Sequence, residues 1–271
     1  SGLLSFHPTQ TATWADFNND GWLDVFIGNE TADWLQSKGK VHPCELFLNN
    51  QDGTFTDVAQ QANCAITNYV KGVTSGDFNN DGWKDIFIST MDGKRYLLKN
   101  RGQGKQTPHF EDVTAAAGLA NDPFNSFTTW FWDYDNDGWL DIFVCNYTFQ
   151  KSLAYYEAAE ALKQPIGKNG TIYLYKNNRN GTFTNVSAEA NVQKTTFSMG
   201  GNFGDIDNDG FLDMYLGSGN PNYRSLVPNK MFLNQHGKKF ADVTTSALVG
   251  LLQIGHGVSF VVMVFDGDLV I

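Results

Sequence analysis

An acidic nine-residue segment occurs four times in the 271-residue chain, and this repeat constrains the fold more strongly than any other feature of the sequence. All four copies obey the pattern D-x-[DN]-x-D-G-x-x-D, and a short apolar run follows each of them. The copies begin 61, 56 and 72 residues apart, which indicates a repeated supersecondary unit. They read DFNNDGWLD (16–24), DFNNDGWKD (77–85), DYDNDGWLD (133–141) and DIDNDGFLD (205–213).

A hairpin pattern follows each acidic segment. The stretch LFLNNQDGTFTDV (46–58) reads as a strand, a turn rich in Asn and Gly, and a second strand. Another short strand-like run, such as KGVTSG (71–76), precedes the acidic segment. One repeat therefore contains four strands in a meander, with the acidic loop between strands 1 and 2. Related hairpin stretches occupy 97–113, 174–186 and 231–243.

Four-stranded antiparallel units at this period are typical of the blades of a β-propeller, in which each small sheet packs its apolar faces on its neighbours. We therefore predict an all-β fold in which residues 1–271 form a single propeller domain or a fragment of one. A two-sheet sandwich is the alternative, but it would not explain so regular a repeat. Full repeats are predicted at about 11–58, 71–113, 127–186 and 198–243, with a partial fifth repeat at 255–271.

The fifth repeat does not keep the acidic pattern. Val262, Val264 and Val270 stand where the pattern requires acids or Asn, and only Asp266 could bind a cation. We therefore expect four metal sites and no fifth. The repeat count indicates a fragment of a larger propeller, and a five-bladed ring closed by residues 1–13 is the alternative.

The composition is skewed toward aspartate, with 23 Asp against 6 Glu and a formal net charge of −10. Aspartate suits turns and hard-metal sites, whereas a solvated helical surface would use Glu as freely. The four acidic loops hold 14 of the Asp residues, so bound cations would offset much of the net charge. Nucleic acid and anionic membranes are poor partners for this chain, because they require clustered Lys and Arg.

The acidic loop has the donor pattern of a calcium site. Side chains at positions 1, 3 and 5 converge, the glycine at position 6 permits a turn with positive φ, and the carbonyl at position 7 and the carboxylate at position 9 complete an oxygen cage. Hard oxygen donors without Cys or His argue against zinc and copper, and the number of donors argues against magnesium. The loop differs from an EF-hand, which needs a bidentate Glu at position 12 and flanking helices.

Electrostatics supports the same interpretation. Carboxylates about 5 Å apart repel by roughly 3 kcal/mol per pair at an effective dielectric near 20, so three pairs cost on the order of 10 kcal/mol. The predicted cofactor is Ca²⁺, about four ions per chain.

The aromatic residue at position 7 is expected to anchor packing between blades, with a sugar platform as the alternative. The predicted ligands are Asp16, Asn18, Asp20, Trp22, Asp24, Asp77, Asn79, Asp81, Trp83, Asp85, Asp133, Asp135, Asp137, Trp139, Asp141, Asp205, Asp207, Asp209, Phe211 and Asp213.

With their flanking runs, these loops resemble the FG-GAP/VCBS repeats of integrin α-subunit-type propellers. The accompanying stretches NQDGTFTDVAQQANC, PHFEDVTAAAGL and GTFTNVSAEANV resemble more specifically the propeller of ASPIC/UnbV-type, cartilage acidic protein-like proteins. The resemblance implies a secreted, calcium-loaded propeller, commonly of seven blades, in proteins linked to adhesion or of unknown role. It also implies calcium ligation by the Asp and Asn positions of the four loops.

Length variation is concentrated in the connections between strands 2 and 3. In a meander these connections lie at the end of the blade opposite the acidic loops, and variable loops on a rigid scaffold often carry recognition. Residues 152–162 read as a short amphipathic helix in one of them. The connections span 29–44, 146–170 and 217–229, and their candidate ligand-binding residues are Trp34, Tyr155, Tyr156, Tyr223 and Arg224, although each could instead fold its loop down.

Two functional hypotheses remain open from the sequence. The first is a calcium-stabilised extracellular binding or adhesion module, secreted, periplasmic or at the cell surface, which presents the variable loops to a protein or glycan. The second is the propeller domain of a secreted polysaccharide-active enzyme, a lyase or a hydrolase, although the five scattered histidines accompany no familiar catalytic motif. Assembly with the remainder of the propeller or with other chains is a further option. No apolar run reaches the length of a membrane helix.

The three cysteines are too few for a disulfide scaffold. Cys44 and Cys64 flank one predicted hairpin and could pair, or could be two small buried residues.

Overall fold

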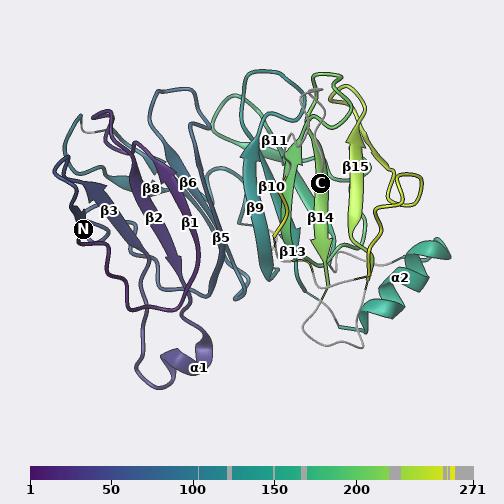
Figure 1. The fold of residues 1–271 in the computed structure, drawn as a ribbon, viewed down its shortest axis with the longest axis horizontal. Coiled ribbons are helices and arrows are strands. Elements are labelled where there is room, and N and C mark those ends of the chain that lie inside the picture. The colour runs from purple at the N-terminus through teal and green to yellow at the C-terminus, as the bar shows by residue number, and fades with distance from the viewer. Residues whose placement is uncertain are drawn as a thin grey trace. The chain divides into compact units, whose positions relative to one another are not determined.

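A computed structural model of the chain describes residues 1–102, 104–120, 124–148, 150–165, 170–219, 227–252, 255 and 257–259. Within them it forms four antiparallel sheets, each a meander of four consecutive strands, which confirms the predicted all-β fold and the four repeats (Figure 1). Most of the predicted fifth repeat lies outside the described residues.

Each sheet is built from the same four elements in chain order. The first two strands are long and the fourth has only three residues. Sheet 1 contains β1 (Thr9–Ala15), β2 (Asp24–Asn29), β3 (Glu45–Asn49) and β4 (Phe55–Asp57), and sheet 2 contains β5 (Val70–Gly76), β6 (Asp85–Thr90), β7 (Arg95–Asn100) and β8 (Phe110–Asp112). Sheet 3 contains β9 (Ser126–Trp132), β10 (Asp141–Asn146), β11 (Ile172–Asn177) and β12 (Phe183–Asn185), and sheet 4 contains β13 (Ser198–Gly204), β14 (Asp213–Ser218), β15 (Lys230–Asn234) and β16 (Phe240–Asp242).

The chain forms two compact units, of residues 1–131 with 177–184 and of residues 132–176 with 185–271. In the first unit, sheets 1 and 2 pack through apolar side chains such as Phe26, Leu46 and Ile86, all fully buried. Gly28 is required at this contact, because a Cβ there would lie 2.7 Å from a methyl group of Val70. Close approach of the two sheets therefore depends on the missing side chain.

Aromatic rings fill the core of the second unit. Trp132 stacks on Phe240 with ring centroids 5.6 Å apart and also meets Phe203 and Phe143. Its side chain is almost completely buried. Such rings bury large apolar areas and contribute strongly to the stability of a small sheet.

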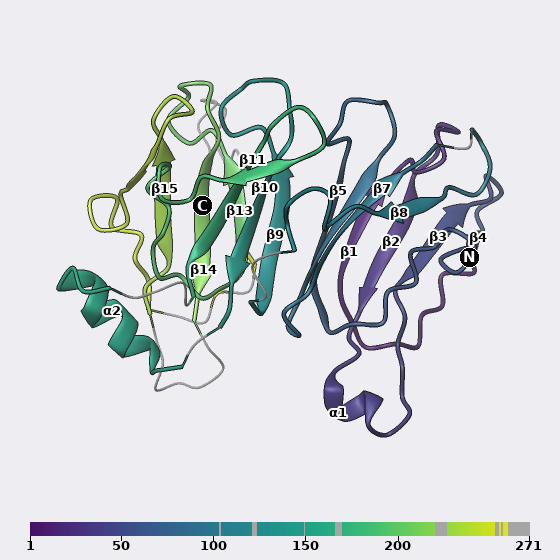
Figure 2. The ribbon, with the colours of Figure 1, turned by 180° about the vertical axis from the view of Figure 1, so that it is seen from behind.

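Main-chain hydrogen bonds link successive sheets within each unit. The N–H of Phe110, which begins β8, donates to the carbonyl of Ala62 at 2.9 Å, and Phe240 at the start of β16 donates in the same way to Ala190. In sheet 1 the equivalent N–H, that of Phe55, donates to Ser1 O at 2.8 Å. The N-terminus accordingly lies beside β4 (Figure 2). The N-terminal segment thus gives sheet 1 the contact that a preceding repeat gives to the other sheets.

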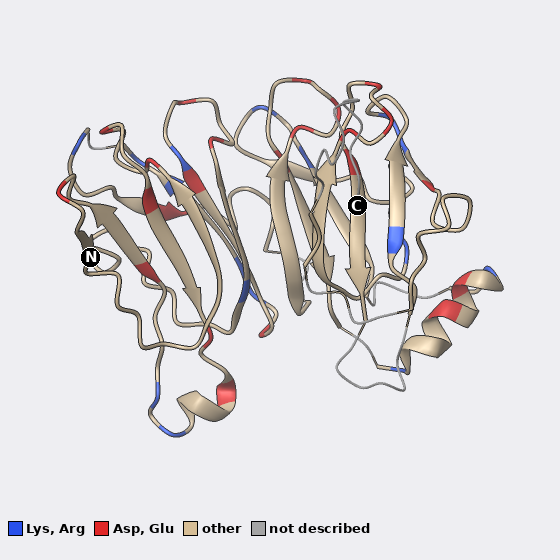
Figure 3. Cartoon of the chain, in the orientation of Figure 1, with Lys and Arg blue, Asp and Glu red and all other residues tan. Residues whose placement is uncertain are grey.

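The acidic loops and the loops between strands 2 and 3 lie at opposite ends of each sheet. Ala15 pairs with Asp24 across the acidic loop of sheet 1, whereas helix α1 (Asp33–Gln36) lies in the connection at the far end of β2 (Figure 1). In sheet 3 that connection contains α2 (Leu153–Ala161), which confirms the predicted short helix. Within each unit, many of the acidic residues lie at the end of the strands that carries the acidic loops (Figure 3).

No helix among the described residues is both long and apolar enough to cross a membrane. Cys44, Cys64 and Cys145 are free, buried thiols. Cys44 and Cys64 belong to the core between sheets 1 and 2, as the second interpretation of this pair proposed.

Candidate metal centre

The four acidic loops share one backbone conformation. Glycine at position 6 has positive φ in every copy, from 84° to 94°, as predicted from the pattern. The asparagine at position 4 also has positive φ, from 53° to 59°, which Asn tolerates better than most residues. These two left-handed residues turn the chain around the acidic side chains. They are Asn19 and Gly21, Asn80 and Gly82, Asn136 and Gly138, and Asn208 and Gly210.

Backbone N–H groups hold the carboxylates at positions 1 and 5. In loop 1, Asp16 accepts the N–H of Asp20 at 3.0 Å on one oxygen and the N–H of Gly21 at 2.8 Å on the other. Asp20 in turn accepts the N–H of Trp22 at 2.9 Å. The same three bonds occur in loops 2, 3 and 4. Hydrogen bonds from the backbone therefore orient these carboxylates without help from a bound ion.

Oxygen atoms of several side chains converge in these loops. In loop 3, oxygens of Asp133, Asp135 and Asp141 lie within 4.8 Å of one another, and in loop 4 those of Asp205, Asp207 and Asp209 do so. In loop 1 the oxygens of Asp16 and Asn18 both accept one N–H, that of Asp20. These acidic groups could hold a metal ion, and a set of hard oxygen donors fits a hard cation.

The aspartate at position 9 is fully buried in every loop and connects the loop to its own sheet. In loop 2, Asp85 accepts the N–H of Phe78 at 3.2 Å on one oxygen and the N–H of Asn100, at the end of β7, at 2.8 Å on the other. Loops 1 and 4 contain the same pair of bonds, at Asp24 and Asp213. The position-9 carboxylate thus holds the start of the acidic loop, just after strand 1, beside the end of strand 3.

Burial makes these carboxylates unusually basic. It raises the pKa of Asp85 to about 7 and that of Asp24 and Asp213 to about 6, with the neighbouring loop acids adding to the effect and the two N–H donors opposing it. A cation in the loop would favour the charged form. The main cost of a charged carboxylate at position 9 is therefore its burial, and repulsion by the neighbouring acids is a smaller contribution.

In loops 2 and 4 the aromatic residue at position 7 packs against its own sheet, which differs from the expectation that it anchors packing between blades. The ring of Trp83 covers Gly102, which begins the turn between β7 and β8. In loop 4, Phe211 meets His236 edge-on, with ring centroids 5.5 Å apart. In these two loops the turn between strands 3 and 4 therefore lies beside the acidic loop. Trp22 of loop 1 is half exposed.

Asparagines at two places in the repeat form contacts that the sequence pattern did not assign. The asparagine that ends strand 3 donates through its side chain to the position-2 carbonyl of the preceding loop, as when Asn100 donates to Phe17 O at 2.8 Å. We call this residue the latch asparagine; the others with this bond are Asn177, to Phe78 O, and Asn234, to Tyr134 O. Asparagine at position 4 also reaches the next loop, from Asn19 to Gly82 O and from Asn136 to Gly210 O. The signal was present, because both positions are Asn in all four repeats.

The predicted ligand-binding residues occupy different environments. Trp34 on α1 is 62% exposed, with Lys38 over its ring, and Tyr155 on α2 is half exposed. Tyr156 is buried, and its hydroxyl accepts the N–H of Gln150 at 3.0 Å. Its role is therefore to hold its own loop in place rather than to contact a ligand. Tyr223 and Arg224 lie outside the described residues.

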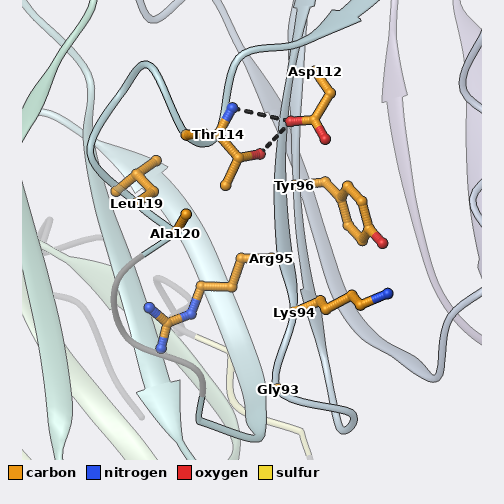
Figure 4. A pocket seen from close by; sticks show the side chains of 9 residues that line it. Gly93, Lys94, Arg95, Tyr96, Asp112, Thr114, Leu119 and Ala120 are labelled. Atoms are coloured by element: carbon orange, nitrogen blue, oxygen red, sulfur yellow. Dashed lines mark hydrogen bonds between the residues drawn. The ribbon is translucent and has the colours of Figure 1, made fainter.

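A cavity of about 420 Å³ lies beside β7 in the first unit (Figure 4). Three of its polar side chains form hydrogen bonds within the fold: Asp112 accepts two bonds from Thr114, and the Tyr96 hydroxyl donates to Asn68 at 2.6 Å. Burial, together with the charges of nearby acids, raises the pKa of Tyr96 to about 12, so the phenol stays protonated near neutral pH.

Comparison with known proteins agrees with the repeat geometry. The family model of the FG-GAP-like repeat matches residues 16–88, 77–144 and 166–216. Cartilage acidic protein 1 of Homo sapiens is 29% identical over 198 residues, which is 72% of this chain and 26% of the human protein, and the Mus musculus protein of that name is 28% identical over the same shares. The chain thus spans about a quarter of the length of these relatives. Among solved structures, the Bacillus licheniformis rhamnogalacturonan lyase PL11 matches 77% of this chain and 39% of its own at 14% identity, with a TM-score of 0.40.

Proposed function

The chain belongs to the FG-GAP-like repeat family, as its motifs predict, and on that basis we propose that it is a calcium-binding propeller module of an extracellular or cell-surface protein. The observation that carries the proposal is the convergence of carboxylate oxygens in loops of one conformation. The residues that would hold calcium are those at positions 1, 3, 5 and 9, with the carbonyl of position 7. Calcium would neutralise these acids and hold the loops in their folded conformation beside the neighbouring sheets.

Calcium suits these loops better than magnesium. Calcium accepts six to eight oxygen ligands in flexible geometry, whereas magnesium demands a near-ideal octahedron with shorter bonds and gives up its waters reluctantly. Each loop offers carboxylate or amide oxygens at positions 1, 3, 5 and 9, and a carboxylate can bind through one or both oxygens. The role of such an ion is structural, since it holds a loop that connects two strands and contacts the next repeat.

The ion count tests this proposal. We expect four calcium ions per chain, because four loops keep the full pattern and the fifth repeat has only Asp266 at its acidic positions. Isothermal titration calorimetry on the chelated protein, together with elemental analysis after desalting, measures the number directly. A variant with Asp205→Ala and Asp209→Ala should lose one ion and keep three. A count of five, or no binding at millimolar calcium, would contradict the proposal.

We further propose that the loops between strands 2 and 3 present a binding surface for a protein or glycan. Trp34 supports this because it is the kind of large aromatic residue that anchors interfaces, and it is exposed on α1, in the connection that follows β2. Rigid sheets below a variable loop favour recognition.

The surface proposal predicts which tryptophan matters. Immobilised polysaccharides and matrix proteins that retain the wild-type chain should retain Trp34→Ala at least tenfold more weakly. Trp14→Ala is the matched control, because it removes a half-exposed tryptophan on β1 near the acidic-loop end of sheet 1 and outside the predicted calcium ligands. Equal loss in both variants would count against this surface. Release of unsaturated or reducing sugars from a bound polysaccharide would favour the alternative, a polysaccharide-active enzyme.

A further inference from the structure

Two of the four acidic loops contact a lysine ammonium group. In loop 2 the Nζ atom of Lys99 lies 3.3 Å from a carboxylate oxygen of Asp81. In loop 3 the Nζ atom of Lys176 is bonded to Asp135 and lies 3.5 Å from an oxygen of Asp137. Both lysines occupy the same place in the repeat, the residue of strand 3 immediately before the latch asparagine. Lys99 therefore contacts the carboxylate at position 5 of its loop, and Lys176 contacts those at positions 3 and 5.

Loops 1 and 4 have leucine at that place, Leu48 and Leu233. In loop 1, Asp20 accepts a bond from the neutral amide of Gln51 at 3.1 Å, and Lys105 adds only a longer-range charge. In loop 4, His236 Nδ1 lies 3.4 Å from Asp209, and a histidine there is a cation only when protonated. The four loops thus fall into two classes by the group that meets their acids.

A calcium ion and a lysine ammonium would compete for the same oxygens. Binding calcium in loop 3 requires the ion pair between Lys176 and Asp135 to break, and it leaves a positive charge near the ion. The Lys176 side chain is 36% exposed, so it can move toward solvent, which limits the penalty without removing it. When calcium is absent, the same ammonium offsets the repulsion among the carboxylates.

We propose that Lys99 and Lys176 are tethered counterions that compete with calcium, so that the chain binds two calcium ions tightly in loops 1 and 4 and two more weakly in loops 2 and 3. This inference rests on the proposed calcium binding. As the calcium concentration rises, loops 1 and 4 then bind calcium first and loops 2 and 3 bind it second. It also makes the metal-free state of loops 2 and 3 more stable than that of loops 1 and 4.

Leucine variants test the inference, because leucine is the residue that sheets 1 and 4 already have at this place. Calorimetric titration of the wild-type chain with calcium should show two classes of two sites whose affinities differ by about tenfold or more. In Lys99→Leu/Lys176→Leu the weak class should tighten by about tenfold. The control Lys40→Leu removes one charge from an exposed position in the connection between β2 and β3, and should leave both classes unchanged.

Thermal melts give a second measurement that a purely structural role would not reproduce. In chelator the double leucine variant should melt below the wild type, because it has lost two counterions. In millimolar calcium it should melt at or above the wild type, because the ions no longer compete with lysine. A variant that melts lower under both conditions, or calcium affinities that do not change, would overturn the inference. Absence of calcium binding by the wild type would instead contradict the proposed function, and the melts in chelator would still measure the counterion effect.

Discussion

Removal of calcium is expected to lower the melting temperature of the chain by about 10–20 °C. With dissociation constants of about 0.03 mM for the two tight sites and about 0.3 mM for the two weak ones, 1 mM calcium stabilises each tight site by about 2 kcal/mol and each weak site by about 0.9 kcal/mol. Four sites then contribute about 5–6 kcal/mol, and each kcal/mol shifts the melting temperature of a domain of this size by about 2–4 °C. Differential scanning calorimetry in EDTA and in calcium measures the shift.

The specificity of the restored stability is the second part of this result. Returning excess calcium should recover the melting temperature, and equimolar magnesium should recover much less of it, because the loops offer more oxygens than an octahedral ion uses. Sodium at matched ionic strength is the control for general screening of the −10 charge. A melting temperature indifferent to EDTA would contradict the proposed role of calcium.

Repetition explains why so much of the fold could be predicted from the sequence. Four copies of one pattern place each strand by comparison with the others, so β2, β6, β10 and β14 all begin at the position-9 aspartate. Glycine at position 6 was predicted from the turn it must make, and its positive φ confirms the reason. Local patterns of this kind depend on neighbouring residues and are visible in a single sequence.

Contacts between residues far apart in the sequence could not be predicted in the same way. The carbonyl that Asn100 meets belongs to Phe17, 83 residues earlier, and nothing in the local pattern identifies that partner. The contact of Lys176 with Asp135 likewise depends on how strand 3 lies beside the acidic loop of the same sheet. Tyr156 illustrates the opposite difficulty, because an aromatic residue in a variable loop can be buried or exposed, and only packing decides.

The latch asparagine gives the second large effect. Asn100→Ala is expected to cost about 2–4 kcal/mol in the free energy of unfolding, because it removes three hydrogen bonds at a fully buried site. The Asn100 side chain donates to Phe17 O at 2.8 Å and to Lys84 O at 3.2 Å, and it accepts the N–H of Gly102 at 3.1 Å. The bond to Phe17 joins sheet 2 to the loop of sheet 1, so its loss weakens the contact between repeats.

Asn49 provides the matched control, since it is the residue of sheet 1 at the same place. It donates to Leu23 O at 3.2 Å and accepts the N–H of Gln51 at 2.9 Å, both within its own repeat, and it is only partly buried. Water can replace these bonds, so Asn49→Ala should cost about 1 kcal/mol or less. Urea unfolding followed by tryptophan fluorescence in saturating calcium compares the two variants. Equal costs would mean that the bond between repeats adds nothing, whereas a larger cost at Asn100 assigns the difference to the latch and to its burial.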